Sequence, residues 1–316
     1  MIATLIQQTV NALTIGSIYA LIALGYTMVY GVLRLINFAH GEMFMLGAYA
    51  AFLAVTLMVG GIAGAGTIVL AIAFFGAVLA VGIVGVLIER VAYKPLRNST
   101  RLAPMLSSLG VSLTLVTGIQ ILAGPQPMAF PSFFPNSRLN ILGASVTVMQ
   151  IGILAAALLL MAGLHLLVNR SRIGVIVRAV SENRRTAQLL GINADLAISM
   201  VFFVGPLLGA AGGILYASYY GIMTPTMGAV IGMKAFTAAI LGGIGSIPGA
   251  MLGAYILAFV EVGGTALLPV ISGGLLGTEY RDVLAFAILI LVLLIKPAGI
   301  LGERVSEESM VYKREF

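Results

Sequence analysis

Nine long apolar runs fill most of this sequence, and they restrict it to one kind of surrounding. A helix needs about 20 apolar residues to cross roughly 30 Å of hydrocarbon. Runs of about that length lie at 10–33, 39–60, 66–88, 104–123, 147–168, 196–220, 227–245, 248–268 and 283–300. Only 9% of the residues are charged, against about 25% in soluble proteins. The sequence therefore predicts a polytopic membrane protein, and it argues against a soluble enzyme or a nucleic-acid-binding domain.

The apolar runs are continuous and not alternating, which predicts transmembrane helices and not a β-barrel. We expect an all-α bundle of eight or nine membrane-spanning helices. Some should be broken, because Gly and Pro interrupt the runs at 227–245 and 248–268. Residues 1–316 are expected to form one transmembrane domain. The N-terminus lacks the basic stretch of a signal peptide, so the first run is predicted to be a retained span.

Nine of the 17 basic residues fall in two short links between apolar runs. The link at 89–101 holds Arg90, Lys94, Arg97 and Arg101, and the link at 170–185 holds Arg170, Arg172, Arg178, Arg184 and Arg185. Both are predicted to be cytoplasmic, because short loops rich in Lys and Arg remain on that side. Counting spans then places the N-terminus and the proline-rich loop at about 124–146 outside, and the tail from Lys296 inside.

Ionisable or polar side chains interrupt the apolar sequence at a few points. Such groups are costly in lipid and are usually functional or paired. One hypothesis is that they line a translocation pathway, and the candidates are Asn37, His40, Glu42, Lys234 and Glu261. The alternative for the stretch from Arg34 to Glu42 is a short cytoplasmic turn. The alternative for Lys234 is a buried ion pair, with Glu42 or Glu261, that only fixes helix packing.

The link at about 169–195 mixes apolar and charged residues, which predicts a short amphipathic helix on the cytoplasmic side. Ser181 can cap this helix, with Glu182 in its first turn, and Gly191 and Asn193 can end it. The helix either rests on anionic membrane lipid or docks into a cleft of a cytoplasmic partner.

No residue pattern predicts an enzyme. The chain has no cysteine and only two histidines, neither at a zinc-binding spacing, so we expect no metal site and no cofactor. It has 39 glycines but no Gly-Lys pair, which a phosphate-binding loop requires. The glycine-rich stretch at 242–249 is better interpreted as a helix break, and the chain is not expected to hydrolyse ATP.

Several long stretches are typical of one family. They are LTIGSIYALIALGYTMVYGVLRLINFAHGE at 13–42, ERVAYKPLR at 89–97, RAVSENRRTAQLLGIN at 178–193, GMKAFTAAILGGIGSIPGAMLGA at 232–254, TEYRDV at 278–283 and KPAGILG at 296–302. With these stretches the chain resembles the membrane-spanning permeases of branched-chain amino acid ABC importers, the LivH-like branch in particular. The resemblance covers nearly the whole chain and is weakest at 124–146.

This resemblance implies an importer of Leu, Ile and Val in the bacterial inner membrane. It implies a second permease subunit, usually a different chain, two cytoplasmic ATP-binding subunits and a periplasmic amino-acid-binding protein. It also implies that the charged link couples the permease to the ATPase. The coupling role falls on Glu182, Ala187 and Gly191, with Arg178, Arg184 and Arg185 as flanking contacts.

Other functions remain open at this point. A urea or short-amide ABC permease would resemble the same family, and a passive amide channel is a further option. An ion-coupled secondary carrier would use Lys234, Glu42 and Glu261 as a charge relay and would need no ATPase partner.

Overall fold

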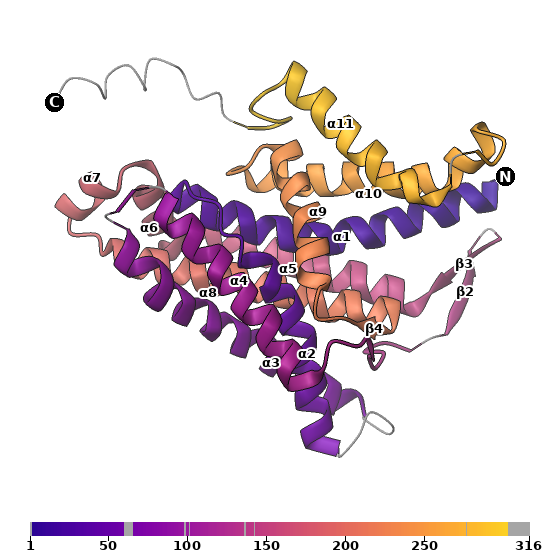
Figure 1. Cartoon of the computed structure of the whole chain (residues 1–316), viewed down its shortest axis with the longest axis horizontal. Helices are drawn as coiled ribbons and strands as arrows, with labels where there is room; N and C mark the ends of the chain where they lie inside the picture. Colours follow the sequence, from indigo (N-terminus) through magenta and orange to yellow (C-terminus); the bar gives the residue numbers. More distant parts are fainter. Residues whose placement is uncertain are drawn as a thin grey trace.

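A computed structural model describes residues 2–59, 66–97, 99–100, 102–135, 137–141, 143–275 and 277–302. The helices are α1 (Ile2–Leu33), α2 (His40–Val59), α3 (Thr67–Ile88), α4 (Leu102–Ala123), α5 (Val148–Arg170), α6 (Arg172–Glu182), α7 (Arg184–Leu189), α8 (Ala194–Tyr220), α9 (Met227–Gly242), α10 (Ile247–Ile271) and α11 (Arg281–Ile295) (Figure 1). A π-helical turn (Glu89–Tyr93) and a 3₁₀ turn (Lys94–Leu96) extend α3, and a 3₁₀ turn (Thr278–Tyr280) precedes α11. In the described part of the chain, seven helices are long and apolar enough to cross a membrane. The predicted helical membrane bundle is confirmed.

Each predicted apolar run contains one helix, although some boundaries differ. The first helix begins at Ile2 and not near residue 10. The helix tolerates its early polar residues because they bond one another: Asn11 accepts hydrogen bonds from Gln7 (3.2 Å) and from Gln150 of α5 (2.9 Å). Among the helices in the predicted runs, α9, with 16 residues, and α11, with 15, are the shortest. Both fall below the length of a full span.

Two helices end earlier than the apolar pattern predicts. Helix α9 stops at Gly242, three residues before the predicted end, because Gly243 has φ +107°. The side chain of Ser246 then caps α10 by accepting a hydrogen bond from the N–H of Gly249 (3.2 Å). Helix α11 stops at Ile295, because Pro297 disfavours the helical conformation at Lys296, the residue before it. The stretch 242–249 is the predicted helix break.

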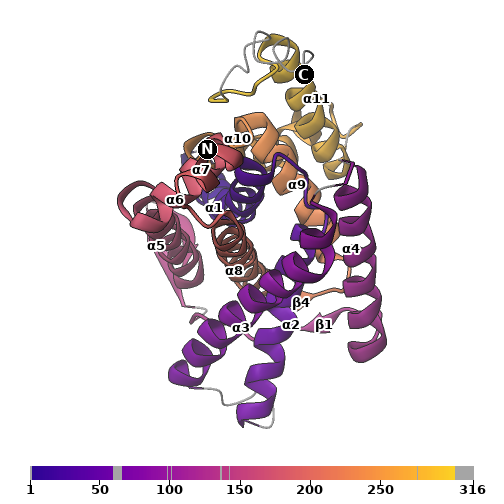
Figure 2. The ribbon, with the colours of Figure 1, turned by 90° about the vertical axis from the view of Figure 1, so that its left-hand side faces the viewer.

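Helix α1 lies at the centre of the bundle (Figure 2). It packs against α5, α8, α9 and α10, while α2 and α3 pack against α8. Helices α4 and α11 lie at the periphery (Figure 2). Three serines attach α4: Ser108 accepts a hydrogen bond from the N–H of Phe38 (3.3 Å), and the other two donate hydrogen bonds, Ser112 to Glu42 (3.1 Å) and Ser107 to the carbonyl of Ala92 (3.0 Å).

The loop at 124–146 contains short strands that the sequence analysis does not predict. Strand β1 (Met128–Ala129) pairs with β4 (Ile222–Met223), which follows α8 directly, and β2 (Arg138–Ile141) pairs with β3 (Ala144–Thr147), both antiparallel. The N–H of Ser145 donates a hydrogen bond to Gln7 near the N-terminus (3.0 Å). This loop and the N-terminus therefore share one end of the bundle, and α6 and α7 lie at the other (Figure 1). That arrangement agrees with the predicted sidedness.

Glycines allow α2 and α8 to approach closely. A Cβ atom at Gly213 of α8 would overlap the carbonyl oxygen of Phe44 in α2. We expect Gly213→Ala to destabilise the folded permease by about 1–3 kcal/mol, because two helix backbones cannot separate locally without losing other contacts. Gly76→Ala is the matched control, since nothing lies within 4 Å of a Cβ atom there. Thermal unfolding of the purified protein measures both, and equal midpoints would contradict this account of the packing.

Candidate functional site: the coupling region and the intramembrane charges

The charged link folds into two helices and not the single one predicted. Helix α6 ends at Glu182, and α7 begins at Arg184. The predicted cap at Ser181 is wrong: Ser181 lies inside α6 and donates to the carbonyl of Arg178 (2.8 Å). Asn183 caps α7 instead, accepting a hydrogen bond from the N–H of Thr186 (3.0 Å). An Asn side chain reaches this N–H as well as a Ser does, so residue type alone could not choose the cap.

The residues predicted to couple the permease to its ATPase lie along α6, α7 and the turn after them. Ala187 is the buried residue of α7, whereas Glu182 and Arg185 are exposed. Arg178 donates a hydrogen bond to the carbonyl of Val168, which fastens α6 to the end of α5. Gly191 ends the segment with φ +81°, and a Cβ atom there would meet nothing within 4 Å. Glycine is therefore suited to this position by its backbone conformation and not by lack of space.

The tip of α7 carries two leucines that the sequence analysis does not select as site residues. Leu189 is 84% exposed and Leu190 is 76% exposed. They lie between charged residues, at the end of the bundle away from the N-terminus (Figure 1). Adjacent apolar side chains exposed outside the apolar spans indicate a surface that either a partner protein or the membrane interface covers. The sequence signal was a Leu-Leu pair directly before Gly191 in a link that also carries several arginines.

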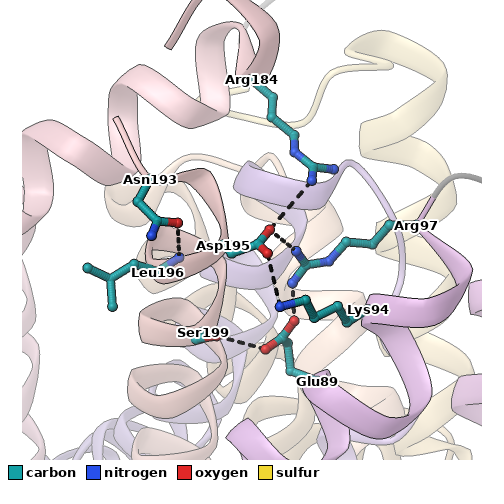
Figure 3. Close-up of polar contacts among 8 residues, drawn as sticks. All are labelled: Glu89, Lys94, Arg97, Arg184, Asn193, Asp195, Leu196 and Ser199. Atoms are coloured by element: carbon teal, nitrogen blue, oxygen red, sulfur yellow. Dashed lines mark hydrogen bonds and ion pairs between the residues drawn. The ribbon is translucent and has the colours of Figure 1, made fainter. Parts of the chain in front are cut away.

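An ion-pair network joins α7 to the start of α8 and the end of α3 (Figure 3). Asp195 of α8 is its centre, with Arg97 at 2.7 Å, Lys94 at 3.0 Å and Arg184 of α7 at 3.6 Å. Arg97 also pairs with Glu89, which accepts a hydrogen bond from Ser199 (2.8 Å). The side chains of Glu89 and Arg97 are only 1% and 6% exposed. The two links predicted to lie on one side of the membrane are thus in direct contact.

The network continues inward through the π-helical turn. Tyr93, four residues after Glu89, donates a hydrogen bond to the side-chain oxygen of Asn37 (2.7 Å). The same oxygen accepts from the N–H of Ala39 (3.0 Å), just before α2. The π-helical turn thus carries two sets of polar contacts: Glu89 belongs to the ion-pair network that reaches Arg184 on α7, and Tyr93 bonds to the break between α1 and α2. Single π-helical turns inside helices occur often at functional sites.

The stretch from Asn37 to Glu42 forms a buried break and not an exposed cytoplasmic turn. The chain leaves α1 at Arg34, which is exposed and has φ +54°. Beyond it, Asn37, His40 and Glu42 are 4%, 0% and 1% exposed. The ring of His40 lies 4.6 Å from the ring of Tyr26 in α1. A Cβ atom at Gly25 would overlap the His40 ring, so the ring packs directly against the backbone of α1.

A second charged cluster lies among α1, α9, α10 and α11. Lys234 of α9 pairs with Glu261 of α10 at 2.8 Å and with Asp282 of α11 at 2.7 Å. Tyr19 of α1 donates a hydrogen bond to Glu261 (3.0 Å). The predicted pair of Lys234 with Glu261 is confirmed, whereas Glu42 bonds to Ser112 and not to Lys234. Asp282 was missed; its signal was the pair of charges that opens the last apolar run.

The class of protein follows from three features: long apolar helices, charged side chains buried among them, and the pair of short charged helices α6 and α7 at one end. They are typical of a polytopic membrane transport protein. Residues 8–293 match the model of the family described as branched-chain amino acid transport system / permease component, and the chain belongs to this family.

The chain is similar to curated permeases from bacteria and an archaeon. It is 45% identical to the high-affinity branched-chain amino acid transport system permease protein LivH of Escherichia coli K12, over 94% of this chain and 95% of the relative. It is 44% identical to the BraD permease of Pseudomonas aeruginosa PAO1, over 94% and 95%. It is 30% identical to a probable LivH of Methanocaldococcus jannaschii, over 92% and 91%. No solved structure matches the chain.

Proposed function

We propose that this chain is the membrane permease subunit of an ATP-driven importer of Leu, Ile and Val in the bacterial inner membrane. The observation that carries the proposal is the exposed apolar tip of α7, Leu189 and Leu190, on a helix pair held by caps and ion pairs. Such a tip fits docking into a groove of a cytoplasmic ATP-binding subunit, a partner that an ion-coupled carrier does not require. The names of the relatives, which specify branched-chain amino acid transport, support the substrate class.

The proposed assembly contains two cytoplasmic ATP-binding subunits, a second permease subunit of different sequence and a periplasmic binding protein. Residues 1–316 act in it as one permease domain. The tip of α7 enters a groove of the ATP-binding subunit. The coupling residues are the predicted set together with the two leucines: Arg178, Glu182, Arg184, Arg185, Ala187, Gly191, Leu189 and Leu190.

The ion-pair network gives this coupling a route into the membrane. Closure of the ATP-binding subunits displaces α7, and Arg184 and Asp195 transmit the displacement to α8. Arg97, Glu89 and Tyr93 extend it to Asn37 at the break before α2. ATP binding changes the equilibrium only if the inward-facing and outward-facing states offer α7 different contacts. A rigid, buried pair such as Glu89 with Arg97 transmits a displacement better than exposed side chains do.

The pathway in this proposal passes Lys234 and Glu261. The stretch with Asn37, His40 and Glu42 borders it as the broken segment whose movement opens or closes the route. The burial of Asn37, His40 and Glu42 supports this assignment, as do the contacts of His40 with α1 and of Glu42 with α4 and α9. A displacement of this segment would shift all three helices at once.

Labelled leucine uptake tests the proposal in cells that carry or lack this chain, with the ion gradients collapsed and ATP kept high. Uptake that requires the chain and survives the collapse supports an ATP-driven importer. Uptake that requires the chain but stops with the gradients would contradict it. That outcome would favour the second candidate, an ion-coupled carrier. The buried pair of Lys234 with Glu261 is the observation that supports this candidate. Inhibition of uptake by excess urea, but not by excess isoleucine, would favour a urea permease.

A further inference from the structure

Three arginines lie where α5 turns into α6, and together they are the arginine corner. Arg170 is the last residue of α5, Arg172 is the first of α6, and Arg178 donates a hydrogen bond to the carbonyl of Val168 near the end of α5. All three arginines are exposed. In the described part of the chain, no carboxylate forms an ion pair with any of them. Uncompensated positive charges repel one another, so the corner favours an anion from outside this chain.

The bundle holds this corner in a fixed shape. Ser171, between two of the arginines, caps α6 by accepting a hydrogen bond from the N–H of Gly174 (3.1 Å). A Cβ atom at Gly174 would overlap the carbonyl oxygen of Val168, so the backbones of α5 and α6 are in direct contact. Val177 and Val180 bury the inner face of α6. Binding of an anion therefore requires little ordering of the backbone.

The arginine corner lies at the depth of the lipid headgroups. Helix α5 has 23 residues and is therefore about 35 Å long, slightly more than the roughly 30 Å of hydrocarbon that a span crosses. It begins after β3, at the end of the bundle that holds the N-terminus, and finishes at the opposite end (Figure 1). Arg170 and Arg172 are thus expected just beyond the hydrocarbon, beside the lipid phosphates.

The outer face of α5 leads from the hydrocarbon to this corner. Leu159 is 73% exposed and Leu166 is 58% exposed. Leu159, Leu166 and Arg170 are spaced by seven and four residues, which places them on one face of the helix. An acyl chain that packs along the two leucines therefore has its headgroup close to Arg170.

The exposed face of α6 has the composition of a helix in the headgroup layer. Val175 is 55% exposed and lies three residues from both Arg172 and Arg178. An apolar side chain between two cations suits the boundary between headgroups and acyl chains, where each finds a favourable contact.

We propose that the arginine corner binds the phosphate of an anionic phospholipid. A guanidinium group donates two parallel hydrogen bonds to phosphate oxygens, which favours phosphate over other anions. Helix α6 then lies against the membrane, while α7 with its exposed leucines meets the protein partner. Arg178 contributes to coupling by holding α6 at the membrane. The proposal depends on the depth of the corner and not on the transported substrate.

Native mass spectrometry of the purified full-length chain tests this site. The folded chain in detergent is titrated with dioleoylphosphatidylglycerol or dioleoylphosphatidylcholine, and the bound lipids are counted. The test variant combines Arg170→Gln with Arg172→Gln, whose side chains are exposed, so the fold should survive. The control combines Arg90→Gln with Lys296→Gln, which removes two exposed positive charges outside the corner.

We expect the test variant to bind phosphatidylglycerol about 25-fold more weakly, because each arginine near a membrane surface contributes about fivefold. The control should bind it within about twofold of the unchanged chain. Phosphatidylcholine, whose headgroup has no net charge, should bind weakly and equally to all three. Neither inorganic phosphate nor glycerophosphoglycerol, the headgroup without acyl chains, should displace phosphatidylglycerol at equal concentration.

Three results would overturn the lipid site. The first is equal affinity of the test variant and the control for phosphatidylglycerol. The second is displacement of the lipid by inorganic phosphate or glycerophosphoglycerol, which would make the corner a site for soluble phosphates. The third is loss of lipid binding when purified ATP-binding subunits are added, which would show that protein covers the corner.

Leucine uptake by cells is measured separately, so the two proposals can fail independently. Uptake that survives the collapse of ion gradients, with no lipid preference at the corner, would overturn the lipid site alone. Lipid binding at the corner without ATP-driven uptake would overturn the proposed function alone.

Discussion

Replacing Leu189 and Leu190 together by Ser is expected to lower ATP-driven leucine uptake more than tenfold and to leave the permease folded. Fully burying one leucine contributes about 1.5–3 kcal/mol, so the pair contributes roughly 3–6 kcal/mol to docking. A loss of 3 kcal/mol weakens binding by about two orders of magnitude. The fold should survive because the two side chains are 84% and 76% exposed and contribute little to the core. Binding of purified ATP-binding subunits to the variant in nanodiscs measures the docking directly.

Gln188→Ala is the control for that experiment, because Gln188 is exposed on the same short helix but offers no apolar tip. It should retain uptake and binding within about twofold. If the double leucine variant binds the ATP-binding subunits with unchanged affinity, α7 is not the docking element. If it loses binding together with thermal stability, the two leucines support the fold and the assignment is likewise wrong.

Arg97→Met is expected to be the most damaging single change in the ion-pair network around Asp195. It leaves Glu89 buried, at 1% side-chain exposure, without its cation. Removing one partner of a buried ion pair costs about 3–5 kcal/mol, because the other charge stays desolvated. Lys94→Met removes the ion pair with Asp195, in which the Lys94 side chain is 52% exposed and the Asp195 side chain 43% exposed. Exposed pairs contribute only about 0–1 kcal/mol, so Lys94→Met should be nearly neutral.

The double variant Arg97→Met with Glu89→Gln separates charge from shape. It removes the unpaired carboxylate and keeps the hydrogen bond from Ser199, so it should recover most of the stability lost in Arg97→Met. Its uptake should nevertheless stay low if the pair transmits the motion of α7. Denaturant unfolding gives the free energies, and leucine uptake gives the coupling. If Arg97→Met and Lys94→Met had the same free energy of unfolding, the claim that the buried pair of Arg97 with Glu89 stabilises the fold would be refuted.

The spans could be predicted because lipid imposes a simple local rule on the chain. Every predicted run contains a helix, since the polar N–H and C=O groups of a backbone in hydrocarbon must hydrogen-bond to one another. The errors occur where distant partners change the local preference. Helix α1 includes Gln7 and Asn11 because Asn11 accepts hydrogen bonds from Gln7 and from Gln150, which lies far along the chain. Ser181 and Asn183 are both acceptable caps, and only the packing of α6 chooses between them.

The candidate sites were predicted less completely, for a related reason. Lys234 and Glu261 stand out as charges in apolar sequence, so their pairing could be foreseen. Asp282 lies at the start of its run, where a charge is unremarkable, and its link to Lys234 appears only in three dimensions. The bond from Arg97 to Asp195 joins residues 98 positions apart. No periodicity or spacing carries information of that kind.

The central position of α1 has a consequence for how the protein is made. This helix is synthesised first, yet two of its polar groups bond to residues of α10 that are synthesised much later: Ser17 to Tyr255 and Tyr19 to Glu261. Their sequence separations are 238 and 242 residues. At about 5–20 residues per second, α1 waits roughly 12–50 seconds for these partners. A chain whose synthesis stops before α10 therefore holds both hydroxyls in the bilayer without these partners.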